Sequence, residues 1–348
     1  MTNYGMSIKK KLFRHSQLYK KVDMENNAKK IFIVGCPRSG TTLLQSMLLN
    51  LEGSYSMPET HFFDLLPDNN YVAPRSLPPL FPFVYKNRVD GATCKRVIDA
   101  MKKHSRLVMH DDSVHELHQQ AKGGTLSVAE LFEAVVQSYN KHGKELLIEK
   151  TPTHIFHVPY IRALFPDALI VHIVRDPRDV YPSFNGLLEK LGKRKRTVRE
   201  FCVLWNYCIE MTRVQKIKTV RYEDLVQRPL EATNALLAST GMSVTALDEE
   251  NYKQIVKPHE VWHANLGKKI IATNFGKYKT ILSKEVIAEI EVLCLDGMRA
   301  FGYTPYENAE RSFFVRIRGS FFWAIQKGLI YVSVLLAFFK RKIHNLFV

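Results

Sequence analysis

Cysteine is scarce in this chain of 348 residues, and none of its five cysteines belongs to a CxxC pair. The scattered spacing argues against a zinc site or a dithiol redox motif, so we expect small buried thiols in a reducing compartment. No apolar run follows the basic N-terminus, and neither a signal peptide nor an N-terminal anchor is predicted. The chain is therefore predicted to stay in the cytoplasm.

Acidic residues are also in short supply, because 34 Asp and Glu face 50 Lys and Arg and leave a formal net charge of +16. A field of this sign attracts phosphates, sulfates, acidic glycans, nucleic acid or anionic lipid, and it does not choose among them. Hydrophobic residues make up 46% of the chain, which is ordinary for a globular protein. The length allows one large α/β domain, or two small ones, with a sizeable core.

Short apolar runs alternate with helix patterns, which is typical of an α/β fold with a central parallel sheet flanked by helices. Strands are expected at 31–34, 145–148, 168–174 and 219–222. Helices are expected at 42–50, 126–142, 160–165, 178–191, 198–213 and after Pro229. A segment rich in proline and aromatics, 66–92, is predicted to be an insertion that lies over the site.

The run Gly35–Thr42, Gly-Cys-Pro-Arg-Ser-Gly-Thr-Thr, has the spacing of a Walker A loop but lacks its lysine. Thr41 stands in the place of that lysine, and Arg38 inside the loop supplies a cation instead. The strand 168–174 is followed by Arg175, where an NTPase would place a Mg²⁺-binding aspartate. Glycines, inward-pointing amides and a helix N-terminus still suit an anionic group. The alternative is a glycine-rich turn that only joins strand to helix.

A second anion site is predicted in the run Val174–Ser183, which leaves a buried strand and enters a helix. Arg175 stands at the carboxyl end of that strand, where α/β folds bind ligands. Ser183 follows about two helical turns later, so a guanidinium and a hydroxyl can converge on a phosphate. The alternative is a structural ion pair between Arg175 and Asp176.

Three motifs in one order make the chain similar to sulfotransferases that use PAPS (3′-phosphoadenosine 5′-phosphosulfate), and closest to their tyrosylprotein and carbohydrate branch. Pro37–Leu43 resembles the 5′-phosphosulfate loop of this family, and Ile173–Ser183 resembles its 3′-phosphate motif. Val220–Leu225 resembles the strand and turn that follow, and the resemblance covers residues 31–305. It implies a P-loop-like three-layer α/β fold, and sulfuryl transfer from PAPS to an acceptor hydroxyl with release of PAP and without a metal.

The resemblance also implies two sets of contacts to the donor. The 5′-phosphosulfate would be cradled by the loop residues Arg38, Ser39, Gly40, Thr41 and Thr42. Arg175 and Ser183 would hold the 3′-phosphate, and Tyr222 would lie near the adenine. The segment Thr273–Lys279 resembles the loop that closes over the nucleotide, with Lys277 as a phosphate contact, although it lacks the tryptophan often found there.

Sulfuryl transfer is an in-line displacement at sulfur, which requires a base, cations and the alignment of both reactants. Arg38 and Lys150 are the predicted cations, and Lys150 matches the lysine in the post-strand motif of the family. Glu59 resembles the catalytic glutamate of the tyrosylprotein-type branch, whereas His154 is nearer to the histidine of cytosolic sulfotransferases. Glu59 is favoured because burial can tune a carboxyl pKa toward neutrality. A surface or capping role for Glu59 and a packed role for His154 are the alternatives.

The acceptor and the cellular location are less clearly indicated. The basic run 190–199 is either a solvated turn between helices or a dock for an acidic glycan or an anionic membrane. The apolar stretch Ser320–Phe339 is framed by cations and could form a helix about 30 Å long. A helix in the membrane interface is favoured over a membrane span or packing on the domain. We therefore expect a cytoplasmic chain with peripheral or C-terminal attachment to a membrane, and no nucleic-acid partner.

On this interpretation the chain has three parts: a basic extension over 1–29, a sulfotransferase domain over 30–308 and a tail over 309–348. Two rival functions stay open. One is a P-loop kinase-like phosphotransferase, which the missing lysine and aspartate argue against. The other is a catalytically inactive, nucleotide-binding membrane adaptor. It would be distinguished by whether Lys150 and Glu59 approach the loop that carries Arg38.

Overall fold

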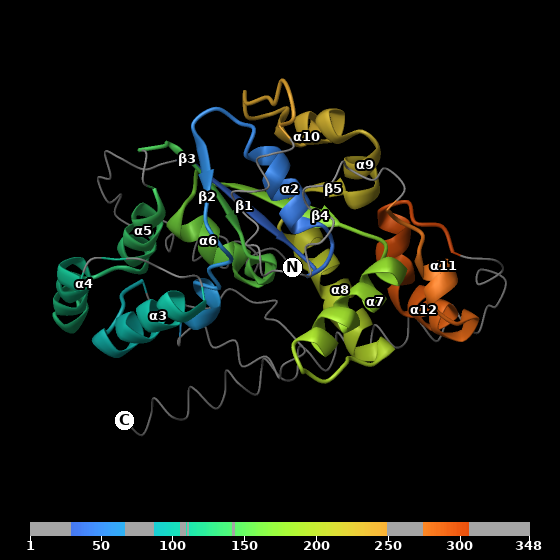
Figure 1. Cartoon of the computed structure of the whole chain (residues 1–348), viewed down its shortest axis with the longest axis horizontal. Helices are drawn as coiled ribbons and strands as arrows, with labels where there is room; N and C mark the ends of the chain where they lie inside the picture. Colours follow the sequence, from blue (N-terminus) through green and yellow to red (C-terminus); the bar gives the residue numbers. More distant parts are fainter. Residues whose placement is uncertain are drawn as a thin grey trace, which may run out of the picture.

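The computed structural model describes residues 29–66, 87–104, 109, 111–140, 143–248 and 274–305. A five-stranded sheet lies at its centre, formed by β1 (Lys29–Gly35), β2 (Ser54–Ser56), β3 (Leu146–Lys150), β4 (Leu169–Val174) and β5 (Lys218–Arg221). The order across the sheet is β2-β3-β1-β4-β5, and every neighbouring pair runs parallel (Figure 1). The predicted α/β fold with a central parallel sheet is confirmed.

Alternate residues of the buried strands face opposite layers, as the pleat of a strand requires. In β1, Ile31 and Ile33 pack beneath one layer of helices, α2 (Thr41–Leu48), α9 (Tyr222–Gln227) and α10 (Pro229–Leu237). Phe32 and Val34 face a larger core built with α3 (Gly91–His104), α5 (Val128–Tyr139), α6 (Val158–Leu164), α8 (Val198–Val214) and α12 (Lys284–Ala300). Figure 1 shows the two layers on either side of the sheet.

Local signals in the sequence explain where several helices begin. Capping boxes start α5 at Ser127 with Glu130, and α8 at Thr197 with Glu200. Asp176 caps α7 (Pro177–Lys190), which has proline at its first position, where a missing N–H costs nothing. These capped starts fix the directions in which the chain leaves the sheet.

The carboxyl ends of three strands lie side by side and carry the predicted site. The register places Lys150 of β3 next to Ile33 of β1, and Gly35 of β1 next to Ile173 of β4. Beyond these ends the chain enters α2, the short helix η2 (Pro152–His157) and α7, respectively from β1, β3 and β4. Open parallel sheets bind ligands at this edge.

Other predictions need correction. The four predicted strands exist with shifted ends, but Tyr222 begins α9 instead of ending β5, since the chain turns into a helix after Arg221. Strand β2 was not predicted because Ser-Tyr-Ser contains no apolar run. Also not predicted were α3, α12, α4 (Asp111–Lys122), α11 (Tyr278–Ile281) and the short helix η1 (Phe63–Leu65).

All five cysteines are buried and free, as expected of small core residues. The predictions for the N-terminal extension, for most of the proline-rich insertion and for the tail fall outside the described residues. Within the described ranges, no helix combines the length and the apolar character that a membrane crossing requires.

Candidate active site

The loop between β1 and α2 has a shape that requires glycine at two positions. A Cβ atom on Gly35 would lie 2.7 Å from a carbonyl oxygen of β4, and one on Gly40 would overlap the ring of Tyr222. Gly40 is the N-cap of α2 with φ 101°, and no side chain caps this helix. Thr41 and Thr42 are buried in its first turn. The amides and the positive end of the helix dipole therefore face the loop and suit an anion.

Two polar side chains of this loop are placed as an anion would need them. Arg38 has a left-handed backbone (φ 74°), which is uncommon outside glycine, and its Nε donates to Ser183 Oγ at 3.3 Å. Burial and the neighbouring charge of Arg175 lower the pKa of the Arg38 guanidinium. Ser39 Oγ is buried and has no hydrogen-bond partner in the described part of the chain. Converging cations and an unsatisfied hydroxyl are typical of an anion site.

Arg175 follows β4 directly, and neutral groups orient its guanidinium. The guanidinium lies 4.2 Å from the ring centroid of Tyr222, and its Nη2 donates to the backbone oxygen of Asn274 at 3.1 Å. Trp205 Nε1 donates to the backbone oxygen of Arg175 at 3.1 Å, which fixes the chain at this point. Arg175 Nε is buried and has no partner among the described residues. A phosphate could supply the missing acceptor.

The start of α7 is held by carboxylates. Asp176 accepts a hydrogen bond from the backbone N–H of Arg178 and binds its guanidinium at 2.6 Å, so it pairs with Arg178 and not with Arg175. Asp179 accepts from the backbone N–H groups of Gly276 (2.6 Å) and Tyr278 (2.9 Å). The segment predicted to close over the nucleotide is therefore attached to α7 where it is described.

Lys277 lies in this attached segment as the N-cap residue of α11. Its side chain is exposed. Nothing in the described segment occupies it with a carboxylate, because the carboxylate nearest in sequence contact, Asp179, accepts backbone N–H groups on either side of it.

Lys150 and Glu59 meet beside the phosphate loop. Lys150 Nζ lies 2.5 Å from Glu59 Oε1, with side-chain exposures of 5% for the lysine and 39% for the glutamate. Although burial opposes its charge, Lys150 and His61 hold the pKa of Glu59 well below its usual range. The carboxylate of Glu59 in turn acts to raise the pKa of Arg38, so the pair lies within electrostatic reach of the loop. The structure brings together the predicted cations and one predicted base.

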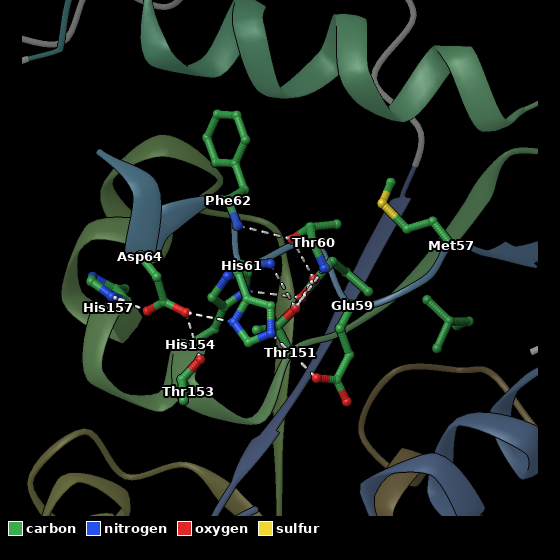
Figure 2. Close-up of polar contacts among 12 residues, drawn as sticks. Met57, Glu59, Thr60, His61, Phe62, Asp64, Thr151, Thr153, His154 and His157 are labelled. Atoms are coloured by element: carbon green, nitrogen blue, oxygen red, sulfur yellow. Dashed lines mark hydrogen bonds and ion pairs between the residues drawn. The ribbon is translucent and has the colours of Figure 1, made fainter. Parts of the chain in front are cut away.

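His154, the other predicted base, has different surroundings (Figure 2). Its Nδ1 lies 3.0 Å from Glu149 Oε2, and the ring is fully buried. Glu149 Oε1 accepts hydrogen bonds from the hydroxyls of Thr151 (2.7 Å) and Thr60 (2.9 Å). Although burial opposes the charge, His154 and these hydroxyls lower the pKa of Glu149. These are the surroundings described above as the alternative for His154, a packed and hydrogen-bonded histidine.

Several polar residues of the site were not identified from the sequence. Asp179 and Glu223 lie inside the quoted motifs, but their partners are far away in the chain: Glu223 accepts from the backbone N–H of Asp176 at 3.1 Å. His61 and Asp64 follow Glu59 closely, and that proximity was the available signal. In the part of the chain that is described, no group of three or more His, Cys, Asp or Glu residues is placed to hold a metal ion.

The model of the sulfotransferase family matches residues 30–246, which is more than half of the sequence. The chain belongs to this family, and the predicted resemblance is confirmed. The sulfotransferase domain from the curacin biosynthetic pathway has the same fold. It is 18% identical, with a TM-score of 0.51 over 81% of this chain and 100% of that one.

Two curated relatives are similar over a shorter stretch. The omega-hydroxy-beta-dihydromenaquinone-9 sulfotransferase Stf3 of Mycobacterium tuberculosis is 29% identical over 150 residues, which are 39% of this chain and 37% of the relative. The carbohydrate sulfotransferase 5 of Homo sapiens is 25% identical over 172 residues, which are 41% of each chain. The match thus spans less than half the length of either relative.

Proposed function

We propose that this chain transfers a sulfuryl group from PAPS to an acceptor hydroxyl and releases PAP. The contact between Arg38 Nε and Ser183 Oγ at 3.3 Å carries the proposal, because it joins the loop after β1 to the helix after β4. A donor with a 5′-phosphosulfate and a 3′-phosphate needs two anion sites that adjoin each other at one sheet edge. Membership of the sulfotransferase family supports the same conclusion.

The residues present fit this donor. We assign the 5′-phosphosulfate to the loop residues Arg38, Ser39, Gly40, Thr41 and Thr42, where a buried hydroxyl lacks a partner in the described chain. Arg175 and Ser183 would take the 3′-phosphate, and the buried Nε of Arg175 supports this assignment. The ring of Tyr222, already packed against the guanidinium of Arg175, would face the adenine. Lys277 would add a phosphate contact from the segment attached to α7.

For the chemistry we assign the base to Glu59 and the charge stabilisation to Lys150 and Arg38. The acceptor hydroxyl would give its proton to Glu59 as its oxygen bonds to sulfur. The bond between sulfur and the bridging oxygen breaks, and PAP leaves with the electron pair. Lys150 would leave Glu59 for the charge that develops on the donor, so that the carboxylate becomes available. His154 is the second candidate, and its complete burial against Glu149 favours a structural role.

The acceptor is proposed only as a class. The printed names of the two curated relatives mention a hydroxylated menaquinone and a carbohydrate, so a hydroxyl-bearing lipid or glycan is the proposal for this chain. In the basic run 190–199, Arg194 pairs with Glu200 at 2.7 Å and Lys195 with Glu189 at 2.8 Å. These pairs favour a solvated turn over a dock for an acidic glycan.

Attachment to a membrane through the tail 309–348 also remains a proposal, supported by the sequence alone. Sedimentation of the full-length protein with anionic lipid vesicles, and its loss on truncation after residue 308, would test it.

The function is tested by thermal denaturation and by label transfer. PAP without added metal should raise the melting temperature of the chain, and Mg·ATP should do little. Incubation with ³⁵S-labelled PAPS and fractionated cell extract should label one fraction. Equal stabilisation by Mg·ATP, together with no labelled fraction, would contradict the proposal and favour a phosphotransferase or an inactive adaptor.

A further inference from the structure

The ring of His61 lies between two carboxylates, those of Glu59 and Asp64 (Figure 2). Its Nδ1 lies 2.9 Å from Asp64 Oδ2, and its Nε2 lies 3.5 Å from Glu59 Oε2. The contact is made at the second oxygen of Glu59, since Lys150 contacts Oε1. The side chain of His61 is 45% exposed, so the ring reaches the same open region as Glu59.

Asp64 is itself firmly held. Thr153 Oγ1 donates to Asp64 Oδ2 at 2.7 Å, and His157 Nε2 lies 2.9 Å from Asp64 Oδ1. The hydrogen bond at Nδ1 of His61 orients the ring, and it directs the Nε2–H toward Glu59. The chain thus provides an anchored carboxylate behind a histidine that faces the proposed base.

The backbone of His61 supports a functional interpretation. Its φ of 49° lies in the left-handed region, which residues other than glycine adopt uncommonly. Its N–H donates to Thr151 Oγ1 at 3.4 Å, which ties this conformation to the end of β3. Unfavourable backbone conformations persist where the surroundings enforce them and are concentrated at functional sites.

The charges around the two groups are mixed. Asp64 first, and Glu59 after it, raise the pKa of His61 to about 10, although burial opposes this, so the ring is a cation at neutral pH. Glu59 faces His61, Lys150 and, at longer range, Arg38. On its other side Asp64 faces His157 and His154.

We propose that His61 is a positioning residue that holds Glu59 Oε2, so that the carboxylate stays aimed at the acceptor when Lys150 turns to the donor. This inference rests on the proposed function, because it gives Glu59 and Lys150 the roles stated there. In the step itself the acceptor proton goes to Glu59 Oε1, and His61 keeps its own protons. Without His61, the carboxylate would lose its second contact just as it loses the first.

The test is the pH dependence of kcat, measured with ³⁵S-labelled PAPS and the extract fraction that accepts label. His61→Gln removes the cation but leaves an amide donor of similar reach. Because a nearby cation favours the carboxylate, its loss raises the pKa of Glu59, and the acid limb of kcat should move up by about one pH unit. We also expect kcat to fall about tenfold while the KM for PAPS stays nearly constant.

Two further variants separate positioning from a merely structural role. His157→Gln is the matched control, since His157 also contacts Asp64 but is not among the groups that contact Glu59. It should keep the wild-type acid limb. His61→Arg restores a cation and should return the acid limb toward that of the wild type.

An unchanged acid limb in His61→Gln, or an equal shift in His157→Gln, would overturn the inference while label transfer by the wild type upholds the proposed function. Failure of the wild type to transfer label from PAPS to any fraction would overturn the proposed function, and the inference with it. Should His61→Gln not fold, the pKa of His61 can be followed by NMR titration of the PAP complex. Glu59→Gln should lower that pKa, and an unchanged value would overturn the contact.

Discussion

Two pairs of a glutamate and a histidine lie at the end of β3, and they differ in almost everything except their chemistry. Glu149 and His154 are both fully buried and 3.0 Å apart, and two threonine hydroxyls complete the network. Glu59 and His61 are 39% and 45% exposed and 3.5 Å apart, next to the phosphate loop. A histidine beside a carboxylate is therefore not by itself a sign of catalysis, and access to a reactant decides its role.

The pleat of β3 explains the separation of the two pairs. Glu149 and Lys150 are consecutive, so their side chains leave opposite faces of the strand. In the register Glu149 lies next to Phe32 and Lys150 next to Ile33. The first side chain enters the core to bind His154, and the second meets Glu59.

Arg175 and Arg178 form a parallel comparison at the start of α7. Arg178 is bound by two carboxylates, Asp176 at 2.6 Å and Glu291 at 2.5 Å. The contacts of Arg175 described above are with neutral groups, a tyrosine ring and a backbone oxygen. An arginine whose charge is balanced within the protein stabilises the fold, whereas one with neutral partners is ready for an anion.

The largest expected effect is on turnover, at the exposed pair. Glu59→Gln should lower label transfer from PAPS by about 10²–10⁴-fold, the usual contribution of a general base. PAP should still raise its melting temperature, since the donor contacts are unchanged. Glu145→Gln, an exposed glutamate just before β3, is the control and should keep full turnover. Full turnover in Glu59→Gln with loss in His154→Ala would reverse the assignment of the two pairs.

The buried pair should respond in stability. Glu149→Ala leaves His154 and two hydroxyls without their shared acceptor, and breaking a buried pair costs about 3–5 kcal/mol. The free energy of unfolding in urea measures this loss. Glu59→Ala is the matched variant at the exposed pair and should lose much less. Equal losses for the two variants would mean that exposure does not distinguish the pairs.

The two arginines should separate nucleotide binding from stability. Arg175→Ala should weaken PAP by about 10–100-fold, because hydrogen bonds to charged groups are worth about 1.5–3 kcal/mol. Its affinity for 5′-AMP, which lacks the 3′-phosphate, should change little. Calorimetric titration of both nucleotides gives the comparison, and an equal weakening would show that Arg175 does not bind the 3′-phosphate.

A third kind of histidine gives the smallest effect. His172 on β4 hydrogen-bonds with a hydroxyl of Thr219 at 3.2 Å, and burial lowers its pKa to about 3. The unfolded chain, with a histidine pKa of about 6.5, then binds a proton that the folded chain refuses. This contribution to stability is complete above that pH and decreases below it, by up to about 1.4 kcal/mol per pH unit, until the folded pKa is reached.

His172→Gln should therefore flatten the pH dependence of the unfolding free energy between pH 7 and pH 5. Urea unfolding of wild type and variant across this range measures the difference. Parallel curves would show that His172 is not kept neutral by burial.

The local parts of this molecule could be predicted from the sequence. The apolar run of β1, the glycines of the loop and the start of α2 are encoded by neighbouring residues, and so is the exit of β4 through Arg175 into α7. These features depend on backbone conformation, periodicity and capping, which act over a few residues. Because the motifs lie on such elements, the family could be predicted as well.

The tertiary structure decided what depends on distant partners. It paired the short β2 with β3, attached the segment at Gly276 to Asp179 across 97 positions, and brought Glu59 to Lys150 across 91. It also buried His154 while leaving His61 half exposed, although both are histidines close to a glutamate in the chain. Exposure is a property of the packed layers and not of the residue, so the roles of these two histidines emerge only when the sheet and its helices come together.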